Sequence, residues 1–237
     1  MKNWLKKLFK GWNAFEICFL LSSLAIILVV GITFKSWWLT IASAMLGITG
    51  CVLSAKGKVV AQFVGFGFII VYSILSYFNG FYGEIIINVI VMLPMYVWGI
   101  ISWIRHRDKQ ENVIKVNKIG YKEWILVPIG TVAVFVAFYF ILKALDTSEL
   151  FVSTLSIIGN LVGMYLLVRR SKYGFVTYLV DDVIFGVLWF IPVFRGNWNL
   201  LPIAINSIMN MISDIYGIIS WTRLQKRQKE KIEQEQN

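Results

Sequence analysis

The sequence predicts an all-α integral membrane protein with eight transmembrane helices, six of which form two parallel three-helix repeats. Three observations predict this fold: the composition, eight apolar segments of suitable length, and an internal repeat. The chain has 237 residues, of which 58% are hydrophobic and 15% are charged, and its mean hydropathy is +0.70. Soluble domains carry about 25% charged residues. The composition therefore indicates a chain that lies in lipid.

Eight apolar segments account for most of the chain, and each has close to the roughly 20 residues that a helix needs to cross about 30 Å of hydrocarbon. They are Ala14–Phe34, Trp37–Ala55, Val59–Phe78, Phe81–Ile104, Trp124–Leu142, Glu149–Val168, Tyr173–Phe194 and Asn199–Thr222. The segment at 14–34 follows several lysines, as in a signal peptide, but no small-residue cleavage site follows it. We therefore interpret it as a retained N-terminal helix. Residues 223–237 are expected to form a solvated tail, helical or disordered, so 1–237 forms a single transmembrane domain.

The basic residues are distributed unequally between the two sides of this topology. Loops on the side of the N-terminus hold 20 Lys and Arg, whereas the other side holds only 3, namely Lys35, Lys143 and Arg195. The positive-inside rule then predicts a multi-pass protein of the cell (plasma or inner) membrane with both termini in the cytoplasm. A net charge of +10 could indicate nucleic acid as a partner. Because no Lys or Arg lies within an apolar segment, we expect the lipid bilayer as the partner and no nucleic acid.

An internal repeat relates the two ends of the predicted bundle. The fourth segment ends with Gly99-Ile-Ile-Ser-Trp103 and the last ends with Gly217-Ile-Ile-Ser-Trp221. The alignment extends upstream, so that 37–104 and 149–222 form two triplets joined by a single helix at 124–142. One linking helix returns the second triplet to the starting side of the membrane. This makes the repeats parallel, an architecture of transporters that bind their solute where the halves meet.

Three aspartates, Asp181, Asp182 and Asp214, lie well inside apolar segments. An aspartate at the centre of a membrane helix costs about 2.5–3.5 kcal/mol, and no Lys or Arg lies within a segment to neutralise it. The aspartates are therefore expected to face water, a cation, a proton or hydrogen-bond donors inside the bundle. A protonated or helix-capping aspartate that only stabilises the bundle is the alternative for each. Because adjacent helical residues point about 100° apart, one of Asp181 and Asp182 is expected to face a cavity and the other to pack elsewhere.

Polar residues form a stripe on the last segment, where Asn206, Asn210 and Asp214 recur every four residues. At the repeat offset of 118 residues, Asn88 aligns with Asn206 and Tyr96 aligns with Asp214. Asparagines can also bond two helices together without any solute. Two matching stripes beside buried carboxylates nevertheless favour a solute site between the halves.

Four aromatic residues lie deeper in their segments than the interfacial tryptophans: Tyr96, Trp98, Tyr178 and Trp189. Tryptophans at the ends of spans are typical of the membrane–water interface. The deeper rings are candidates for stacking on a flat solute.

Motifs of other functional classes are absent from the sequence. There is no phosphate-binding Gly-rich loop, no His-Glu-x-x-His pair and no Gly-x-Ser-x-Gly. One histidine, His106, and two dispersed cysteines make no metal-site pattern. We therefore predict no enzyme, no catalytic residue, no cofactor and no metal. A membrane receptor and an intramembrane enzyme, in which Asp181 and Asp214 would imitate an aspartyl dyad, are the alternatives from other classes.

The sequence also resembles the PnuC family of nicotinamide riboside transporters, distant relatives of the SWEET sugar transporters, over roughly residues 37–223. The resemblance rests on Phe81-Tyr-Gly-Glu84, on Leu93-Pro-Met95 and on the Gly99 to Trp103 motif. It implies a three-plus-one-plus-three helix plan and a homotrimer. It also implies facilitated diffusion of the solute, trapped by cytosolic phosphorylation and used for NAD biosynthesis.

The chain departs from the family pattern at positions that the resemblance assigns to the solute. Tyr96 stands where Gln is usual. Phe175 and Tyr178 stand where two Trp are usual, and Asp182 follows Tyr178 by four residues. Related branches of the family carry thiamine, riboflavin and deoxynucleosides. Buried carboxylates suit the pyridinium of nicotinamide riboside or the thiazolium of thiamine better than the neutral solutes. We therefore expect nicotinamide riboside first and thiamine next, with Asp182 and Asp214 offsetting the positive charge, and proton coupling stays open.

Overall fold

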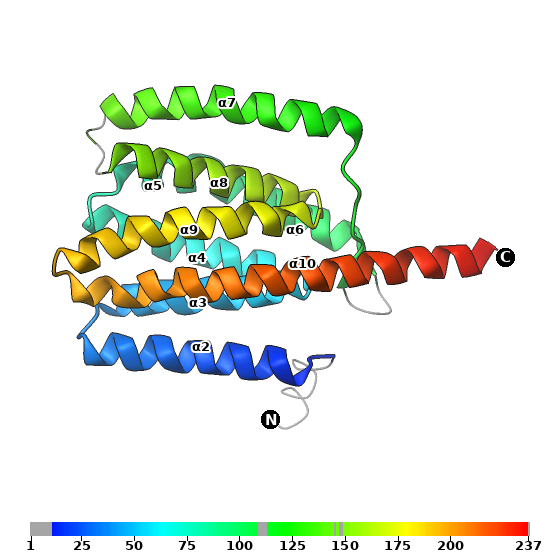
Figure 1. The fold of residues 1–237 in the computed structure, drawn as a ribbon, viewed down its shortest axis with the longest axis horizontal. Helices are drawn as coiled ribbons and strands as arrows, with labels where there is room; N and C mark the ends of the chain where they lie inside the picture. The colour runs from blue at the N-terminus through cyan, green and yellow to red at the C-terminus, as the bar shows by residue number, and fades with distance from the viewer. Residues whose placement is uncertain (1–10, 109–112, 145, 147–148, 237) are drawn as a thin grey trace.

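The computed structural model describes residues 11–108, 113–144, 146 and 149–236, which form a bundle of roughly parallel helices (Figure 1). Within these ranges, eight helices are long and apolar enough to cross a membrane, as the sequence predicts. The elements in chain order are α2 (Ala14–Thr33), α3 (Trp38–Ala55), α4 (Val60–Phe78), α5 (Tyr82–Ile87), η1 (Asn88–Met92), α6 (Leu93–Arg105), β1 (Arg107–Asp108), β2 (Val113–Ile114), α7 (Tyr121–Ala144), α8 (Leu150–Val168), α9 (Tyr173–Phe194), η2 (Trp198–Leu200) and α10 (Leu201–Gln236).

The fourth span departs from the single helix predicted at 81–104. A π turn, η1, separates α5 from α6, and Pro94 lies in the first turn of α6. Proline cannot donate to the carbonyl four residues before it and its ring crowds that carbonyl, and the wider turn ahead of Pro94 accommodates the missing bond. A π turn takes an additional residue. The fourth span is therefore a helix interrupted by one wider turn.

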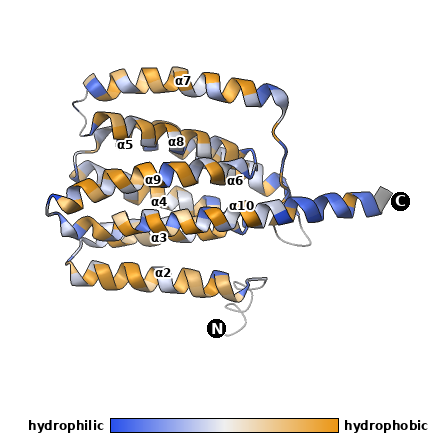
Figure 2. Ribbon diagram, viewed as in Figure 1, coloured by the Kyte–Doolittle hydropathy of each residue, from blue (hydrophilic) through white to orange (hydrophobic). Residues whose placement is uncertain are grey.

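The last helix, α10, is longer than the predicted span. It continues from the membrane-spanning part through the predicted tail and extends beyond the other helices (Figure 1). Figure 2 shows that this extension is hydrophilic, in contrast to the apolar bundle. Lys226 and Lys229 pair with Glu230 and Glu233 one turn further along the helix. The tail is therefore a polar helix from 223 to 236.

The helix boundaries follow the internal repeat. Ala55 ends α3 and Val168 ends α8, while Val60 begins α4 and Tyr173 begins α9, so both pairs are 113 residues apart. The third helix of each repeat packs against the first helix of the other: α10 against α3, and α6 against α8. The two halves therefore exchange equivalent contacts, with α7 as the linking helix.

The repeated Gly-Ile-Ile-Ser-Trp motif has the same structural role in both halves. The indole Nε1 of Trp103 donates to the carbonyl oxygen of Leu167, and that of Trp221 donates to the carbonyl oxygen of Ser54, both at 3.0 Å. The two acceptors are again 113 residues apart, and both indole rings are fully buried. Each half thus hydrogen-bonds its last helix to the first helix of the other half.

The N-terminal helix α2 lies outside the two repeats, against α3 and α10. Its buried Glu16 forms an ion pair with Lys56, in the loop after α3. Glu16 also accepts a hydrogen bond of 2.8 Å from the hydroxyl of Tyr216 on α10. One carboxylate therefore joins α2 to both halves.

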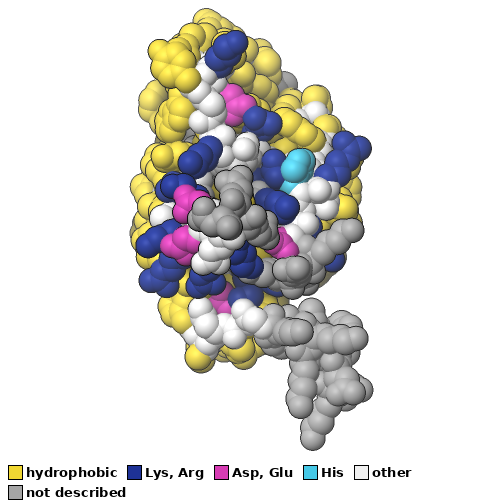
Figure 3. All heavy atoms as spheres, turned by 90° about the vertical axis from the view of Figure 1, so that its right-hand side faces the viewer, with side chains coloured by type: hydrophobic (Ala, Val, Ile, Leu, Met, Phe, Trp, Pro, Cys, Tyr) yellow, Lys and Arg dark blue, Asp and Glu magenta, His cyan; other side chains and the backbone are white. Residues whose placement is uncertain are grey.

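Basic side chains gather at the end of the bundle from which α10 extends, which we call the basic end. It carries Lys56, Lys58, Arg105, Arg169 and Arg170, at or just beyond helix ends, and Arg223, within α10 where its polar extension begins. Figure 3 views this end and shows Lys and Arg spread across it. Burial lowers the pKa of Lys58, the largest effect, and the neighbouring Lys56 lowers it further.

Candidate functional site

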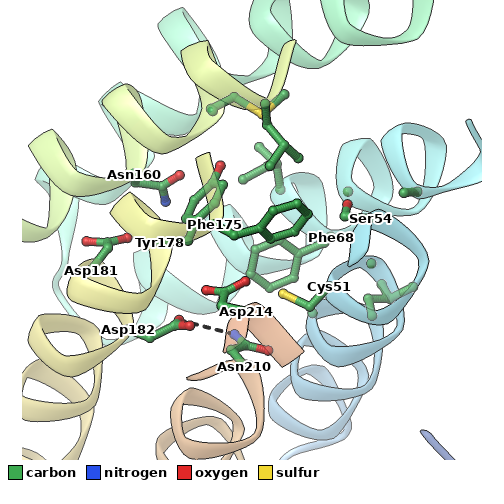
Figure 4. A pocket seen from close by; sticks show the side chains of 18 of the residues that line it. Cys51, Ser54, Phe68, Asn160, Phe175, Tyr178, Asp181, Asp182, Asn210 and Asp214 are labelled. Atoms are coloured by element: carbon green, nitrogen blue, oxygen red, sulfur yellow. Dashed lines mark hydrogen bonds between the residues drawn. The ribbon is translucent and has the colours of Figure 1, made fainter. Parts of the chain in front are cut away.

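A cavity lies between the two halves of the bundle, and both repeats contribute to its wall (Figure 4). The volume of the cavity is about 100 Å³. It is lined by residues of α3, α4, α6, α8, α9 and α10. Its polar lining residues are Cys51, Ser54, Gln62, Tyr96, Asn160, Tyr178, Asp181, Asp182, Asn206, Asn210 and Asp214.

Two carboxylates from different helices meet in this cavity. Asp182 on α9 lies beside Asp214 on α10, and Asn210 donates to Asp182 Oδ1 at 3.5 Å (Figure 4). Neither Asp182 Oδ2 nor Asp214 Oδ2 has a hydrogen-bond partner within the described ranges. Among the residues that the structure describes, no Lys or Arg contributes to the cavity wall. A buried acid without a basic partner needs a proton, a cation or donors from a solute.

Asp181 lies on the same helix but at another side of the cavity. Its carboxylate fits against Gly159 of α8, where an added Cβ would lie 2.5 Å from Asp181 Oδ1. Both Asp181 and Asp182 therefore line the cavity, whereas only one of them was expected to do so. The two side chains point apart, as adjacent helical residues must, and the cavity is wide enough to receive both.

Two tyrosine rings enter the cavity where glycines leave room for them. A Cβ on Gly65 would lie 2.2 Å from the Tyr96 ring, and a Cβ on Gly163 would lie 3.0 Å from the Tyr178 ring. Both tyrosines were predicted as stacking candidates, and the structure brings them into one site. Their flat faces beside carboxylates suit a flat, positively charged ring.

The asparagine stripe of α10 also faces the cavity. Asn206 is only 1% exposed, and neither its Nδ2 nor its Oδ1 has a hydrogen-bond partner in the described part of the chain. Its amide lies 2.9 Å from the position of a Cβ on Gly47. Together with Asn210 it offers amide donors and acceptors that a solute hydroxyl can satisfy.

The structure does not place three of the predicted site residues in the cavity wall. Asn88 is fully buried in the π turn η1, outside the cavity wall. Trp98 is 44% exposed on the outer surface of α6, with its ring 6.2 Å from that of Tyr165. Trp189 is packed in the core, where its Nε1 donates to the Tyr72 hydroxyl at 3.2 Å.

Several cavity residues were missed by reasoning from the sequence alone, among them Gln62 and Asn160. The repeat carries the signal that could have found them. At an offset of 113 residues, Gln62 corresponds to Phe175 and Gly47 corresponds to Asn160, and all four line the cavity. The two Gly-Ile-Ile-Ser-Trp motifs are 118 residues apart, and this offset relates only the third helices.

Aromatic clusters lie beside the cavity, next to its lining residues Phe175 and Phe185. At the basic end, the ring of Phe175 lies 4.9 Å from that of Trp221, edge to face. At the opposite end, the ring of Trp189 lies 5.0 Å from that of Phe81 and 5.9 Å from that of Tyr72.

Comparison with known proteins assigns this architecture. The model of the nicotinamide mononucleotide transporter family matches residues 36–223. The chain belongs to this family. It is therefore a multi-pass membrane transporter and not an enzyme, and the resemblance to the PnuC family is confirmed.

Two curated relatives and one solved structure match over nearly the whole chain. The nicotinamide riboside transporter PnuC of Neisseria mucosa is 27% identical over 94% of this chain and 87% of its own length. The protein of the same name from Haemophilus influenzae is 24% identical over 92% of this chain and 93% of its own length. A crystal structure of the vitamin B3 transporter PnuC superposes with a TM-score of 0.83 at 28% identity, covering 94% of this chain and 97% of that one. The eight-helix fold is therefore that of a solved transporter.

Proposed function

We propose that this transporter carries nicotinamide riboside, bound in the cavity between the two halves. The observation that carries the proposal is the meeting of Asp182 and Asp214 in a cavity wall to which no Lys or Arg of the described ranges contributes. The pyridinium ring of nicotinamide riboside is positively charged and flat, and its ribose carries hydroxyl groups. The names of the two curated relatives support the same solute.

Different residues of the cavity are proposed to bind different parts of the solute. Asp182 and Asp214 offset the positive charge, while Tyr96 and Tyr178 stack on the ring. Asn210 and its neighbour on the stripe, Asn206, bond the ribose hydroxyls, and Asp181 supports the charge from the other side of the cavity. Desolvated cation–π contacts contribute about 2 kcal/mol, and hydrogen bonds to charged groups contribute about 1.5–3 kcal/mol.

We propose facilitated diffusion as the mode of transport, with cytosolic phosphorylation trapping the product. The sequence contains no nucleotide-binding loop that could drive transport. The excess of basic residues at the basic end supports cytoplasmic termini. In proteoliposomes held at zero membrane potential by valinomycin and equal K⁺, an imposed pH gradient should leave the initial rate of uptake unchanged, and faster uptake with an inward proton gradient would indicate proton coupling instead.

A second candidate solute, thiamine, is favoured by the same acids, because its thiazolium ring is also a flat cation. The test is counterflow: proteoliposomes are loaded with unlabelled nicotinamide riboside and take up labelled nicotinamide riboside from outside. Unlabelled nicotinamide riboside, thiamine, riboflavin or deoxynucleosides are added outside as competitors. Nicotinamide riboside should compete most strongly and thiamine next, and inhibition by riboflavin or deoxynucleosides alone would contradict the assignment. The matched control is the Asp182→Asn/Asp214→Asn double variant, which should lose exchange while keeping its melting temperature.

We also propose a homotrimer, the assembly that the family resemblance implies. Linking helix α7 supports it, because only Leu142 of this helix is buried and Ile129, Val132 and Phe140 are more than 60% exposed. This apolar face can pack against another copy. Native mass spectrometry should show three chains of 27.2 kDa together, and a monomer under conditions that preserve transport would contradict the proposal.

A further inference from the structure

A second pocket lies outside the transport cavity, at the basic end between α6 and α8. Its volume is about 210 Å³, and its lining combines Trp98, Ile101 and Ser102 with Arg105, His106, Arg169 and Arg170. None of these residues contributes to the cavity wall described above. The pocket therefore calls for a ligand of its own.

The pocket is rich in hydrogen-bond donors and poor in acceptors. Arg169 pairs with Glu123 of α7, and Arg170 donates through Nη1 to the carbonyl oxygen of Lys115 at 3.3 Å. A guanidinium carries five N–H donors, and within the described ranges the Nε of neither Arg169 nor Arg170 has an acceptor. Burial, followed by the charge of Arg169, lowers the pKa of Arg170, as expected for two crowded cations. An anion in the pocket would relieve this repulsion.

The backbone around the pocket is held in place before any ligand binds. Arg170 has a left-handed φ of 60°, and its N–H donates to the Leu167 carbonyl at 2.8 Å while its own carbonyl accepts from Asn117 at 2.9 Å. Ser102 Oγ donates to the Val168 carbonyl at 3.0 Å, which joins α6 to α8. The arginines thus project from a preorganised loop, which lowers the cost of binding.

An apolar surface continues from the pocket along α6 toward the membrane interior. Trp98 and Ile101 line the pocket and are 44% and 43% exposed. They lie one to two helical turns before Arg105, on the lipid-facing surface of the bundle. A ligand with a phosphate at the arginines and a hydrocarbon chain along Trp98 would match both parts, whereas free phosphate would leave the apolar part uncovered.

We infer that this pocket binds the phosphate group of an anionic phospholipid, with an acyl chain against Trp98 and Ile101. Arginine binds phosphate in a bidentate geometry that lysine cannot provide. Basic pockets between transmembrane helices are known to bind anionic lipid headgroups. The site is separate from the solute cavity, so the inference does not depend on which solute is carried.

The experiment measures the melting temperature of the full-length protein in detergent with added dioleoylphosphatidylglycerol, dioleoylphosphatidylcholine or inorganic phosphate. The anionic dioleoylphosphatidylglycerol should raise the melting temperature more than the zwitterionic dioleoylphosphatidylcholine. Inorganic phosphate should not reproduce this effect. In the Arg105→Gln/Arg170→Gln variant, the apparent affinity for the anionic lipid should fall about fivefold for each charge removed. The single variant Arg105→Gln changes an exposed residue of α6 and leaves the loop at Arg170 intact. It should reduce the apparent affinity for the anionic lipid about fivefold.

A matched control removes two charges from the α10 extension, in Lys226→Gln/Arg227→Gln, and should leave the lipid response unchanged. An equal loss in this control would overturn the inference in favour of bulk charge attraction. If inorganic phosphate stabilises the protein and this effect requires Arg105 and Arg170, the inference of a lipid is overturned and the ligand is a free anion. Equal stabilisation by both lipids would also overturn the inference, whereas Trp98→Ala weakening only the lipid response would support it.

Discussion

The two halves of the transporter share their framework but differ in the chemistry that they bring to the cavity. Asp181 and Asp182 of α9 correspond to Phe68 and Ile69 of α4 at the offset of 113 residues, and all four line the cavity. Asp214 of α10 likewise corresponds to Tyr96 of α6 at the offset of 118. The second half thus supplies all three cavity carboxylates, and the first half supplies uncharged side chains at the equivalent positions.

This difference indicates which features serve the fold and which serve the solute. The equivalent bonds from Trp103 and Trp221 are present in both halves, as expected for a framework in which each half supports the other. The acids are present in only one half, so they are not required to join the repeats. The cavity carboxylates thus come from the second half, and the first half contributes uncharged side chains to the same cavity, which suits a solute with a charged ring.

The largest expected effect comes from the acids of the second half. Asp214→Asn should reduce the kcat/KM of nicotinamide riboside transport at least about 30-fold, because removing one partner of a buried charge interaction costs about 2–5 kcal/mol. Tyr96→Phe, at the equivalent position of the first half, keeps the ring and should cost less than about tenfold. Initial uptake rates in proteoliposomes measure both. Equal losses of kcat/KM in the two variants would contradict the claim that the second half supplies the groups that recognise the charge.

Glycine substitutions should show a smaller asymmetry between the halves. Gly65→Ala places a Cβ within 2.2 Å of the Tyr96 ring, whereas Gly163→Ala places one 3.0 Å from the Tyr178 ring. Overpacking costs about 1–3 kcal/mol, so Gly65→Ala should lower the melting temperature more than Gly163→Ala.

The matched control for these substitutions is Gly67→Ala, where no heavy atom of the described chain lies within 4 Å of the added Cβ. Its melting temperature should equal or slightly exceed that of the unaltered protein, because alanine favours a helix over glycine by about 1 kcal/mol. A larger loss in Gly67→Ala than in Gly65→Ala would show that glycine serves the helices themselves and not the room for Tyr96.

The smallest expected difference is between the two framework tryptophans. Trp103→Phe and Trp221→Phe each remove one indole donor from a carbonyl at 3.0 Å. Each should lower stability by about 1–3 kcal/mol, the cost of a buried group left without its partner. Thermal unfolding in detergent compares them, and a difference of several kcal/mol would contradict the equivalence of the two bonds.

The sequence predicts the eight spans from their apolar composition and the acids of the cavity from the cost of burying charge in lipid. It predicts Tyr96 and Tyr178 from their depth in the apolar segments. It misplaces Asn88, because the spacing of polar residues indicates that this side chain is buried but not whether it faces the cavity or a neighbouring helix. Trp98 and Trp189 resemble cavity residues by depth, but depth does not specify which way a side chain points. Gln62 and Asn160 escape notice because an uncharged amide in a membrane helix is a weak signal.

The central claim is that the acids of the second half recognise the positive charge of the solute. It is tested most directly by comparing the binding of nicotinamide riboside with that of its uncharged dihydro form, which keeps the ribose and the carboxamide. Isothermal titration calorimetry should show that the unaltered protein binds the cation more tightly by about tenfold or more, and that the preference disappears in Asp182→Asn/Asp214→Asn. Equal affinities in the unaltered protein, or an unchanged preference in the variant, would contradict the claim.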